Sequence, residues 1–362
     1  MTKCVVLFSG GVDSLAALVK ARLRYGSENV LAVYCDVGQR YAVKEINAVM
    51  DICEFLHQKF IVDDRLRLGE FEDPKDPNAI IPYRNTFFIL IGALHLPPEG
   101  GVVAIQNVIK GESSTWDRRW VFDQQIQSLL DVADPKRVKL WVPHKDWTKG
   151  EIVAWLRDRV PDEVILKTVG CYSTEMGNCG QCKSCFRRWI ALEWAGIENA
   201  WQYFINDPRK WTEGIKAYVR KMLIGYYHPM RVQQTFSVLQ KYDLIPCMKR
   251  YVFDLDGVIA FTKQELQKSW ELARQNRIEE LQNLYRNATP NEEMIKTVNK
   301  LHELGHAIII YTARHEEDRE LTEEWLKKHG VKYDKIVFGK PHGDIYVDDL
   351  AVRPEEMLTW KV

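Results

Sequence analysis

Short apolar runs alternate with longer amphipathic stretches in the N-terminal part of the chain. A short apolar run bounded by turn residues predicts a buried strand, and apolar residues recurring at three- and four-residue intervals predict a helix. Strands are therefore expected within residues 3–11, 30–38, 59–64 and 101–108, and helices within 14–26, 42–56, 84–96 and 148–159. This alternation predicts a parallel sheet with helices on both faces.

A second alternation of the same kind begins near residue 250. Strands are expected at 251–256, 306–313, 333–339 and 344–349, and helices at 291–305 and 318–330. The stretch between the two alternations has a helical pattern and no convincing strand. The chain is thus predicted to be an α/β protein with two doubly wound parallel-sheet domains joined by a helical connector, divided as 1–200, 201–249 and 250–362.

The overall charge does not favour nucleic acid or an anionic membrane as a partner, because 50 Lys and Arg residues balance 50 Asp and Glu residues. No apolar run is long enough to span a bilayer, and the first one leads into a glycine turn rather than a cleavage site. We therefore expect a cytoplasmic protein without membrane association, either a monomer or a homodimer. Four isolated cysteines fit that compartment as free thiols: Cys4, Cys35, Cys53 and Cys247.

The connector region is locally basic. Residues 186–250 carry eleven Lys and Arg against five Asp and Glu. Aromatic residues are interleaved with these charges, at Trp189, Trp194, Trp201, Tyr203, Trp211 and Tyr218. Basic and aromatic residues together are typical of nucleic-acid binding. We favour the alternative, in which the aromatic residues pack between domains and the charges are solvated.

A glycine-rich turn, "SGGVDS", joins the first predicted strand to the first predicted helix. Gly10 and Gly11 allow a ligand to approach the backbone closely, and the free N–H groups of a helix N-terminus bind anions. Ser9 and Ser14 add hydroxyl donors, and Asp13 can help to hold phosphate-bound Mg²⁺. The turn lacks the Gly-Lys-Ser/Thr ending of the loop that cradles a γ-phosphate. The simpler interpretation is a turn that binds nothing.

This turn resembles the PP-loop of ATP pyrophosphatases, enzymes that split ATP into AMP and pyrophosphate. The resemblance implies a PP-loop (HUP-like) fold and an adenylated substrate. Three further segments extend it: "DVGQR" at 36–40, "IPYRN" at 81–85 and "DWTKGEI" at 146–152. The ATP-binding residues that it implies are Phe8, Ser9, Gly10, Gly11, Val12, Asp13, Ser14, Gly38, Gln39, Arg84, Asn85 and Lys149.

Four of the eight cysteines lie within residues 171–185. They are Cys171, Cys179, Cys182 and Cys185, spaced C-x₇-C-x₂-C-x₂-C. Four thiolates without histidine suit tetrahedral Zn²⁺ in a closed, structural site, with an iron–sulfur cluster as the alternative. A filled coordination shell leaves no position for a catalytic water, so we expect a clamp beside the catalytic pocket.

These segments occur together and in this order, so residues 1–200 resemble QueC, the family of 7-cyano-7-deazaguanine synthases of the queuosine pathway. The resemblance implies zinc at the four cysteines. It also implies conversion of 7-carboxy-7-deazaguanine, ammonia and ATP to the nitrile through adenylated intermediates. Adenylation is needed because a carboxylate would otherwise have to expel oxide. One segment departs from the family, since "QNVIKGESSTWDRRWVFD" replaces a stretch ending Ser-Gly-Tyr-Pro-Asp, and Asp117 and Asp123 are the candidates to substitute there.

Acidic and other polar residues follow the predicted strands of the second domain. Asp254 and Asp256 end the first strand, Thr312 follows the next, Lys340 lies in "FGKP", and Asp348 and Asp349 end the last. Open parallel sheets bind ligands at this edge. The simpler interpretation is that these residues are only solvated.

The order of these residues resembles that of the haloacid dehalogenase (HAD) phosphatases. The resemblance implies a Mg²⁺-dependent phosphatase in which Asp254 is the nucleophile and Asp256 the general acid and base. Thr312 and Lys340 then bind the phosphoryl oxygens, and Mg²⁺ is held by Asp254, Asp256, Asp348 and Asp349. The insert at 261–290 is short and predicted to be helical, which favours an open site for a nucleotide or similar phosphoester.

The chain is therefore predicted to fuse an ATP-dependent C–N ligase with a phosphatase. Two alternatives remain open. One is a PP-loop amidase that adenylates another carboxylate on a nucleic acid or protein. The other is a nucleotide-binding module of a defence or modification complex.

Overall fold

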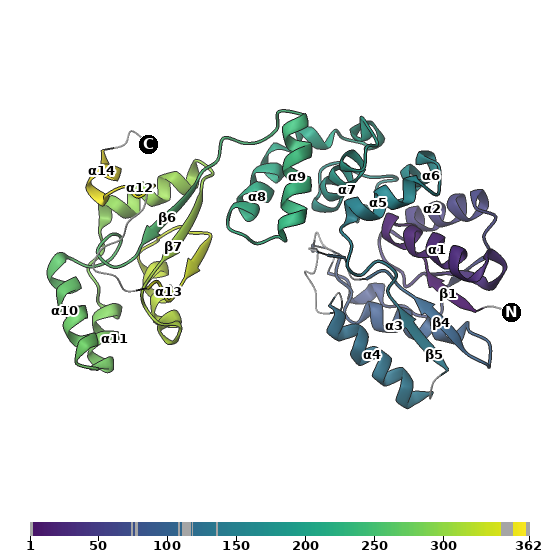
Figure 1. Cartoon of the computed structure of the whole chain (residues 1–362), viewed down its shortest axis with the longest axis horizontal. Helices are drawn as coiled ribbons and strands as arrows, with labels where there is room; N and C mark the ends of the chain where they lie inside the picture. The colour runs from purple at the N-terminus through teal and green to yellow at the C-terminus, as the bar shows by residue number, and fades with distance from the viewer. Residues whose placement is uncertain are drawn as a thin grey trace. The chain divides into compact units, whose positions relative to one another are not determined.

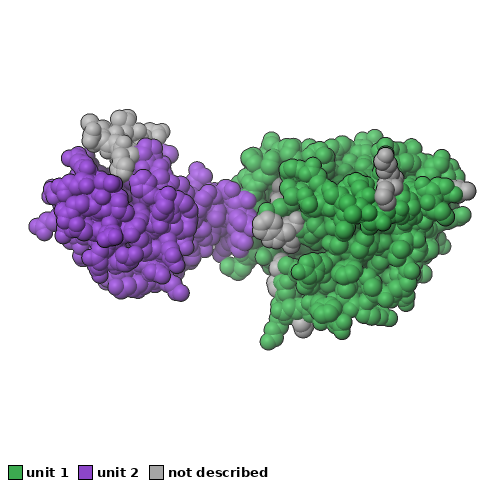
Figure 2. Space-filling model, turned by 90° about the horizontal axis from the view of Figure 1, so that it is seen from below, with its two compact units in different colours: residues 1–214, 227–245 green, residues 215–226, 246–362 purple. Residues whose placement is uncertain are grey.

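The computed structural model describes residues 3–73, 75–76, 79–107, 109–110, 117, 119–134, 137–341 and 350–359. The chain divides into two compact units. Unit 1 comprises residues Met1–Gly214 and Tyr227–Ile245, and unit 2 comprises Ile215–Tyr226 and Pro246–Val362. Figure 2 colours unit 1 green and unit 2 purple. None of the helices in the described part of the chain is long and apolar enough to cross a membrane.

Unit 1 is built on a five-stranded sheet with the order β3-β2-β1-β4-β5, in which all neighbouring strands are parallel. The strands are β1 (Cys4–Leu7), β2 (Val30–Cys35), β3 (Phe60–Asp63), β4 (Gly101–Ala104) and β5 (Val138–Trp141). In the register, Val5 of β1 pairs with Leu31 on one side and Val103 on the other. The order in which strands are added to the sheet thus reverses at β1, because β2 and β3 lie on one side of it and β4 and β5 on the other. Open α/β sheets bind ligands at such a point.

Helices cover both faces of this sheet (Figure 1). The helices of the unit are α1 (Val12–Tyr25), α2 (Ala42–Phe55), α3 (Arg84–Leu94), α4 (Trp120–Ala133), α5 (Lys149–Arg157), α6 (Asp162–Lys167), α7 (Lys183–Trp194) and α9 (Pro229–Lys241). On one face, Ile89 of α3 and Ile126 of α4 pack against alternate strand residues such as Val5 and Val33. Strand residues of the opposite parity, such as Val6, are equally buried. Burial on both sides explains why β1 and β2 appear as continuous apolar runs.

The sequence pattern did not predict β5 or α4. β5 is a four-residue edge strand with only Val138 fully buried. α4 buries Ile126 and Leu130, whereas Trp120 and Val132 are exposed. A narrow buried face mixed with exposed apolar residues does not produce a clear helical period.

Unit 2 contains a three-stranded parallel sheet with the order β6-β7-β8. Its strands are β6 (Arg250–Asp254), β7 (Ala307–Tyr311) and β8 (Lys335–Val337). Its helices are α8 (Thr212–Leu223, within the unit from Ile215), α10 (Lys263–Arg274), α11 (Ile278–Arg286), α12 (Glu292–Glu303), α13 (Arg319–Lys328) and α14 (Pro354–Leu358). The expected strand at 344–349 lies outside the described residues.

The unit 2 core forms where Phe253 and Ile310 of the sheet meet Val298 of α12 and Trp325 of α13. The insert between β6 and α12 is helical, as its pattern predicts. Tyr285 of its second helix joins the same core, so the insert is an integral part of unit 2.

The segment predicted as a connector is shared between the units. Within unit 2, Arg220 of α8 donates from Nη2 to the carbonyl oxygen of His302, 2.6 Å away. Within unit 1, Gln234 of α9 donates to Thr148 Oγ1 at 2.8 Å. Trp189 and Tyr218 are buried, and these two aromatic residues therefore serve packing.

Candidate active sites

A cavity of about 200 Å³ opens in unit 1 at the carboxyl ends of β1, β2 and β4. Leu7 lines it from β1, Phe8 from the residue after β1, Tyr34 from β2, and Gln106 and Asn107 from the segment after β4. This is the edge at which the order of the sheet reverses, and it includes the loop Ser9–Ser14. The cavity therefore lies where a doubly wound sheet is expected to bind a ligand.

The two glycines of the loop have different roles: Gly10 allows close packing on α2, and Gly11 leaves the N-terminus of α1 uncapped. Gly10 has a φ of +72°, and a Cβ atom there would lie 3.0 Å from the carbonyl oxygen of Glu45 and 3.1 Å from Ala48 Cβ on α2. Gly11 is the N-cap of α1 and makes no side-chain cap, so the N–H groups of that helix end are open toward the cavity. Ser14 donates from Oγ to the Gly11 carbonyl oxygen at 2.9 Å.

Basic side chains surround the loop within the cavity. Lys149 is the first residue of α5, whose start is fixed by a capping box between Thr148 and Glu151, and its ammonium group forms an ion pair with Asp13. The other carboxylate oxygen of Asp13, Oδ1, is buried and accepts no hydrogen bond in the described part of the chain. That oxygen suits a metal ion bound to phosphate.

Most residues predicted to bind ATP meet in this cavity. Those that line it are Phe8, Ser9, Gly11, Val12, Asp13, Ser14, Gln39, Arg84, Asn85 and Lys149. Gly10 and Gly38 are not among its lining residues. Gly38, at a φ of +79°, instead receives the close approach of Gly69, where a Cβ atom would lie 2.1 Å from the Gly38 carbonyl oxygen.

Sequence reasoning missed several lining residues: Tyr41, Glu45, Tyr172, Ser184, Arg187 and Arg188. Arg188 is buried, its Nη2 donates to the Ile165 carbonyl oxygen at 3.0 Å, and burial lowers its pKa to about 10. The two arginines lie two and three residues after the last motif cysteine, and Tyr41 and Glu45 lie one and five residues after "DVGQR". Proximity to those motifs was the available signal.

The segment that departs from the family motif still forms a polar network beside the cavity. Asn85 donates to Asp117 Oδ2 at 2.8 Å, and Asn107 donates to Asp123 Oδ1 at 2.8 Å and to the Asp117 carbonyl oxygen at 3.0 Å. Burial raises the pKa of Asp123. Both aspartates thus reach asparagines that line the cavity.

The four cysteines converge with geometry suited to a metal ion. All four Sγ atoms lie within 4.8 Å of one another. The Cys171–Cys182 pair is 4.0 Å apart and the Cys179–Cys185 pair 3.8 Å. A tetrahedron with metal–sulfur bonds of about 2.3 Å has edges of about 3.8 Å, whereas a disulfide would bring two sulfurs to about 2.0 Å. The donor set therefore fits a four-coordinate metal ion.

The cysteine loop is anchored to its surroundings on two sides. Lys44 of α2 donates to Ser173 Oγ at 3.2 Å and to the Glu175 carbonyl oxygen at 3.2 Å. Just before the loop, Val169 donates from its backbone N–H to the Gly10 carbonyl oxygen at 2.9 Å. A backbone hydrogen bond therefore links the segment that leads into the cluster to the glycine-rich loop.

In unit 2, three of the predicted residues meet at the carboxyl end of the sheet. Asp254 ends β6, and its carboxylate forms an ion pair with Lys340, which follows β8. Lys340 also donates from its backbone N–H to the Thr312 carbonyl oxygen at 2.9 Å. Burial raises the pKa of Asp254, an effect that Lys340 opposes. Asp348 and Asp349 lie outside the described residues.

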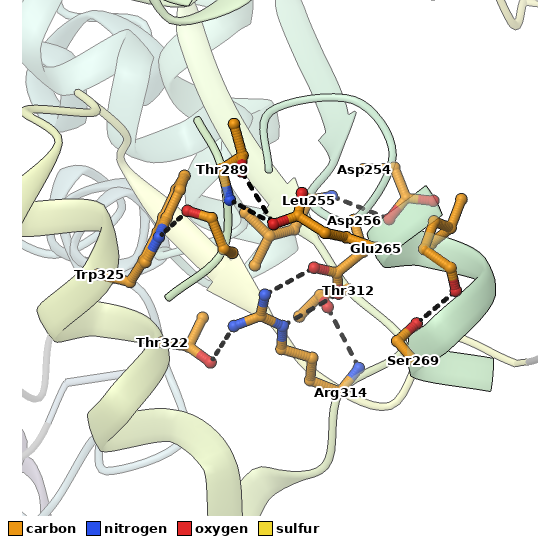
Figure 3. A network of polar contacts seen from close by, with 12 residues as sticks. Asp254, Leu255, Asp256, Glu265, Ser269, Thr289, Thr312, Arg314, Thr322 and Trp325 are labelled. Carbon is orange, nitrogen blue, oxygen red and sulfur yellow. Dashed lines mark hydrogen bonds and ion pairs between the residues drawn. The ribbon is translucent and has the colours of Figure 1, made fainter. Parts of the chain in front are cut away.

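Asp256 is held by an arginine that the sequence reasoning did not single out. Arg314 donates from Nη2 to Asp256 Oδ1 at 2.6 Å and from Nε to Oδ2 at 3.0 Å, so the contact is bidentate (Figure 3). Its third nitrogen, Nη1, donates to Thr322 Oγ1 at 3.1 Å. The guanidinium carbon lies 4.0 Å from the ring centroid of Tyr285 in the insert. The insert therefore helps to fix Asp256.

The sheet, the glycine-rich loop and the cavity of unit 1 are those of a PP-loop domain. A family model described as "Queuosine biosynthesis protein QueC" matches residues 3–196, more than half of the chain. The chain belongs to the QueC family. The match ends at residue 196, before unit 2 begins at Ile215, so it does not extend to unit 2.

Curated relatives cover the same region. A 7-cyano-7-deazaguanine synthase of Campylobacter curvus is 30% identical over an alignment of length 228, which covers 56% of this chain and 98% of that protein. The enzyme of the same description from Methanocaldococcus jannaschii is 28% identical over an alignment of length 232, which covers 56% of this chain and 99% of that protein. A solved Vibrio cholerae chain is 32% identical, covers 32% of this chain and 91% of its own length, and has a TM-score of 0.24; so low a score supports no structural argument.

Proposed function

We propose that unit 1 is an ATP-dependent ligase that converts 7-carboxy-7-deazaguanine and ammonia to 7-cyano-7-deazaguanine. ATP adenylates the carboxylate, ammonia displaces AMP to give the amide, and a second activation dehydrates the amide to the nitrile. The observation that carries the proposal is the cavity at the glycine-rich loop, which collects the open end of α1 together with Arg84, Lys149 and Arg188. Membership of the QueC family supports the choice of substrate.

Each part of the cavity has a role in this reaction. The N–H groups at the start of α1 bind the departing pyrophosphate, which the basic side chains neutralise. Asp13 would hold Mg²⁺, which supplies positive charge on the phosphates when bound. Asp117 and Asp123, positioned by Asn85 and Asn107, are the groups that we assign to the deazapurine. The cysteine cluster would hold Zn²⁺ as a structural ion, since four ligands leave no open position.

The direct test is incubation with ATP, ammonium and 7-carboxy-7-deazaguanine, followed by mass analysis of the products. We expect the nitrile together with AMP and pyrophosphate. Accumulation of the amide would show that the amide is the final product and that the dehydration to the nitrile does not occur. AMP release that depends on another carboxylate, and not on this one, would favour the amidase alternative.

Replacing Asp13 with asparagine tests the glycine-rich loop. The ion pair with Lys149 and the proposed metal ligand are both lost, so we expect AMP formation to fall by about 10²–10³-fold. The unit 2 phosphatase should be unchanged. Asp51→Asn, on the exposed surface of α2, is the matched control. Formation of ADP and phosphate by the wild type would contradict the PP-loop assignment.

We further propose that unit 2 is a Mg²⁺-dependent phosphatase of the HAD type. The convergence of Asp254, Thr312 and Lys340 at one sheet edge favours this second function. Asp254 would attack the phosphorus atom, and Lys340 would bind a phosphoryl oxygen. Asp256 would act as general acid and base. Mg²⁺ would be held by Asp254 with Asp348 and Asp349.

The Arg314–Asp256 pair gives a prediction for this site. Lysine cannot reproduce a bidentate contact, so Arg314→Lys should misplace Asp256 and lower kcat for a generic phosphate ester by about 10–100-fold, with KM little changed. Loss of the bond to Thr322 should also destabilise unit 2 by about 1–3 kcal/mol. Steady-state kinetics and thermal unfolding measure the two effects, with Arg319→Lys on the exposed surface as control. An unchanged kcat would show that Arg314 does not position Asp256.

A further inference from the structure

Glu45 lines the unit 1 cavity, and the proposed binding of pyrophosphate assigns it no role, because its carboxylate would carry the same sign of charge as the phosphates. It lies in the first turn of α2, beside the glycine-rich loop. Its Oε2 accepts hydrogen bonds from the Tyr34 hydroxyl at 3.1 Å and from Gln39 Nε2 at 3.2 Å. Its Oε1 accepts none from the described residues. One carboxylate oxygen is thus fixed, and the other is available to a ligand.

Glu45 has no direct ion-pair partner among the described residues, although the positive charges of Arg84 and Lys44 act on it from nearby. Among the described residues that line the cavity, the acidic ones are Asp13 and Glu45, and Asp13 is paired with Lys149. Glu45 makes no ion pair with the described residues. The neighbouring Arg84 donates to the Tyr41 hydroxyl at 2.6 Å, and Lys44 donates to the cysteine loop. Glu45 therefore offers a negative charge to a small cation.

The surroundings of Glu45 also suit proton transfer. Burial raises its pKa to about 7, although Gln39, Arg84, Tyr34 and Lys44 all act in the opposite direction. A carboxyl group with that pKa can accept a proton at neutral pH and release it again. Burial, reinforced by the Glu45 charge, raises the pKa of Tyr34, so the Tyr34 hydroxyl keeps its proton and continues to donate to Glu45.

The aromatic residues near Glu45, Tyr41 and Tyr172, favour an ammonium-type cation over Mg²⁺. The rings of Tyr41 and Tyr172, which both line the cavity, have centroids 5.1 Å apart. Aromatic faces attract ammonium-type cations. Mg²⁺ instead requires octahedral oxygen ligands and retains its waters. One carboxylate among tyrosines therefore favours ammonium.

We propose that Glu45 binds the ammonium substrate in the cavity and removes one of its protons to generate ammonia. This inference rests on the proposed ligase function. Amines of lysine-like basicity are almost fully protonated at pH 7 and have no lone pair with which to attack. The N–H bond breaks and the proton moves to Glu45. The released lone pair forms the C–N bond of the amide as the C–O bond to AMP breaks, leaving the electron pair on the AMP phosphate. The second proton lost from nitrogen passes to solvent.

The test uses Glu45→Gln and three assays of the full-length protein. The first is ATP–pyrophosphate exchange dependent on 7-carboxy-7-deazaguanine, without ammonium. The second is amide formation from ammonium. The third is hydroxamate formation from hydroxylamine, a nucleophile that is uncharged at neutral pH. We expect the variant to lose about 10²–10³-fold in the second assay alone. Glu54→Gln, exposed on the same helix, should match the wild type in all three.

Other outcomes would overturn the assignment. Equal loss in all three assays would indicate a Mg²⁺ or structural role, and an unchanged ammonium reaction would show that no base acts there. Absence of carboxylate-dependent exchange in the wild type would refute the ligase function itself. If Glu45→Gln does not fold, the pH dependence of the wild-type enzyme still tests whether Glu45 acts as the base. Its ammonium reaction should rise with pH and level off above about 7, as Glu45 loses its proton. A rate that continues to rise above pH 7 in proportion to the concentration of free ammonia would exclude Glu45 as the base.

Discussion

Replacing Asp254 with asparagine is expected to abolish the phosphatase activity proposed for unit 2, with a fall on the order of 10⁴-fold or more. The amide has nearly the shape of the carboxylate but lacks its charge and most of its nucleophilicity. No second carboxylate among the described residues ends a strand of this sheet beside Lys340. Hydrolysis of a generic phosphate ester in the presence of Mg²⁺ measures the effect.

Beryllium fluoride supplies an independent readout for Asp254, since it mimics an acyl phosphate. It should bind the wild type and not Asp254→Asn. Glu271→Gln, on an exposed position of α10, should behave as the wild type in both assays. AMP formation by unit 1 should persist in Asp254→Asn. Retained Mg²⁺-dependent hydrolysis would refute the nucleophile assignment, and parallel loss of both activities in a folded protein would show that the two sites are coupled.

Replacing Cys182 with serine is expected to remove the metal ion and destabilise unit 1 by several kcal/mol. The free energy of binding a structural zinc ion, about 10–16 kcal/mol in small zinc domains, is coupled to folding. AMP formation should fall as well, because Val169, just before the cluster, is hydrogen-bonded to Gly10 in the loop. Elemental analysis, thermal unfolding and AMP release measure the three effects.

The control for Cys182 is Cys247→Ser, because Cys247 is an exposed free thiol. It should retain about one zinc per chain and the wild-type stability. Iron in the purified protein would replace the zinc assignment with an iron–sulfur cluster. Full activity without any metal would show that the cysteines need no ion.

The sequence was most informative where chemistry is local. The loop Ser9–Ser14 and the cysteine spacing each lie within a few residues, so their geometry follows from short-range constraints. The alternation of strands and helices placed Asp254, Thr312 and Lys340 at strand ends, and parallel pairing then brings strand ends to one edge of a sheet. These features could be predicted without coordinates.

Other features depend on contacts between distant segments. Glu45 and Tyr172 share a cavity because the cysteine loop packs on α2, a contact that no periodicity encodes. Arg314 follows β7 and lies 58 residues from Asp256 in the sequence. Only the folded chain brings the two side chains into contact, so no local pattern predicts the pair. β5 was missed because an edge strand with one buried residue has no distinctive pattern.

The division of the segment 201–249 between the two units has a consequence for dissecting the protein. The chain leaves unit 1 after Gly214, returns to it at Tyr227 and leaves again after Ile245. A single cleavage therefore cannot release either unit whole. A fragment starting at residue 246 would lack Arg220, and the end of α12 would lose its bond at His302. An isolated unit 2 fragment should be designed to carry α8 as well, and proteolytic nicking at 224–228 should leave two pieces that stay associated.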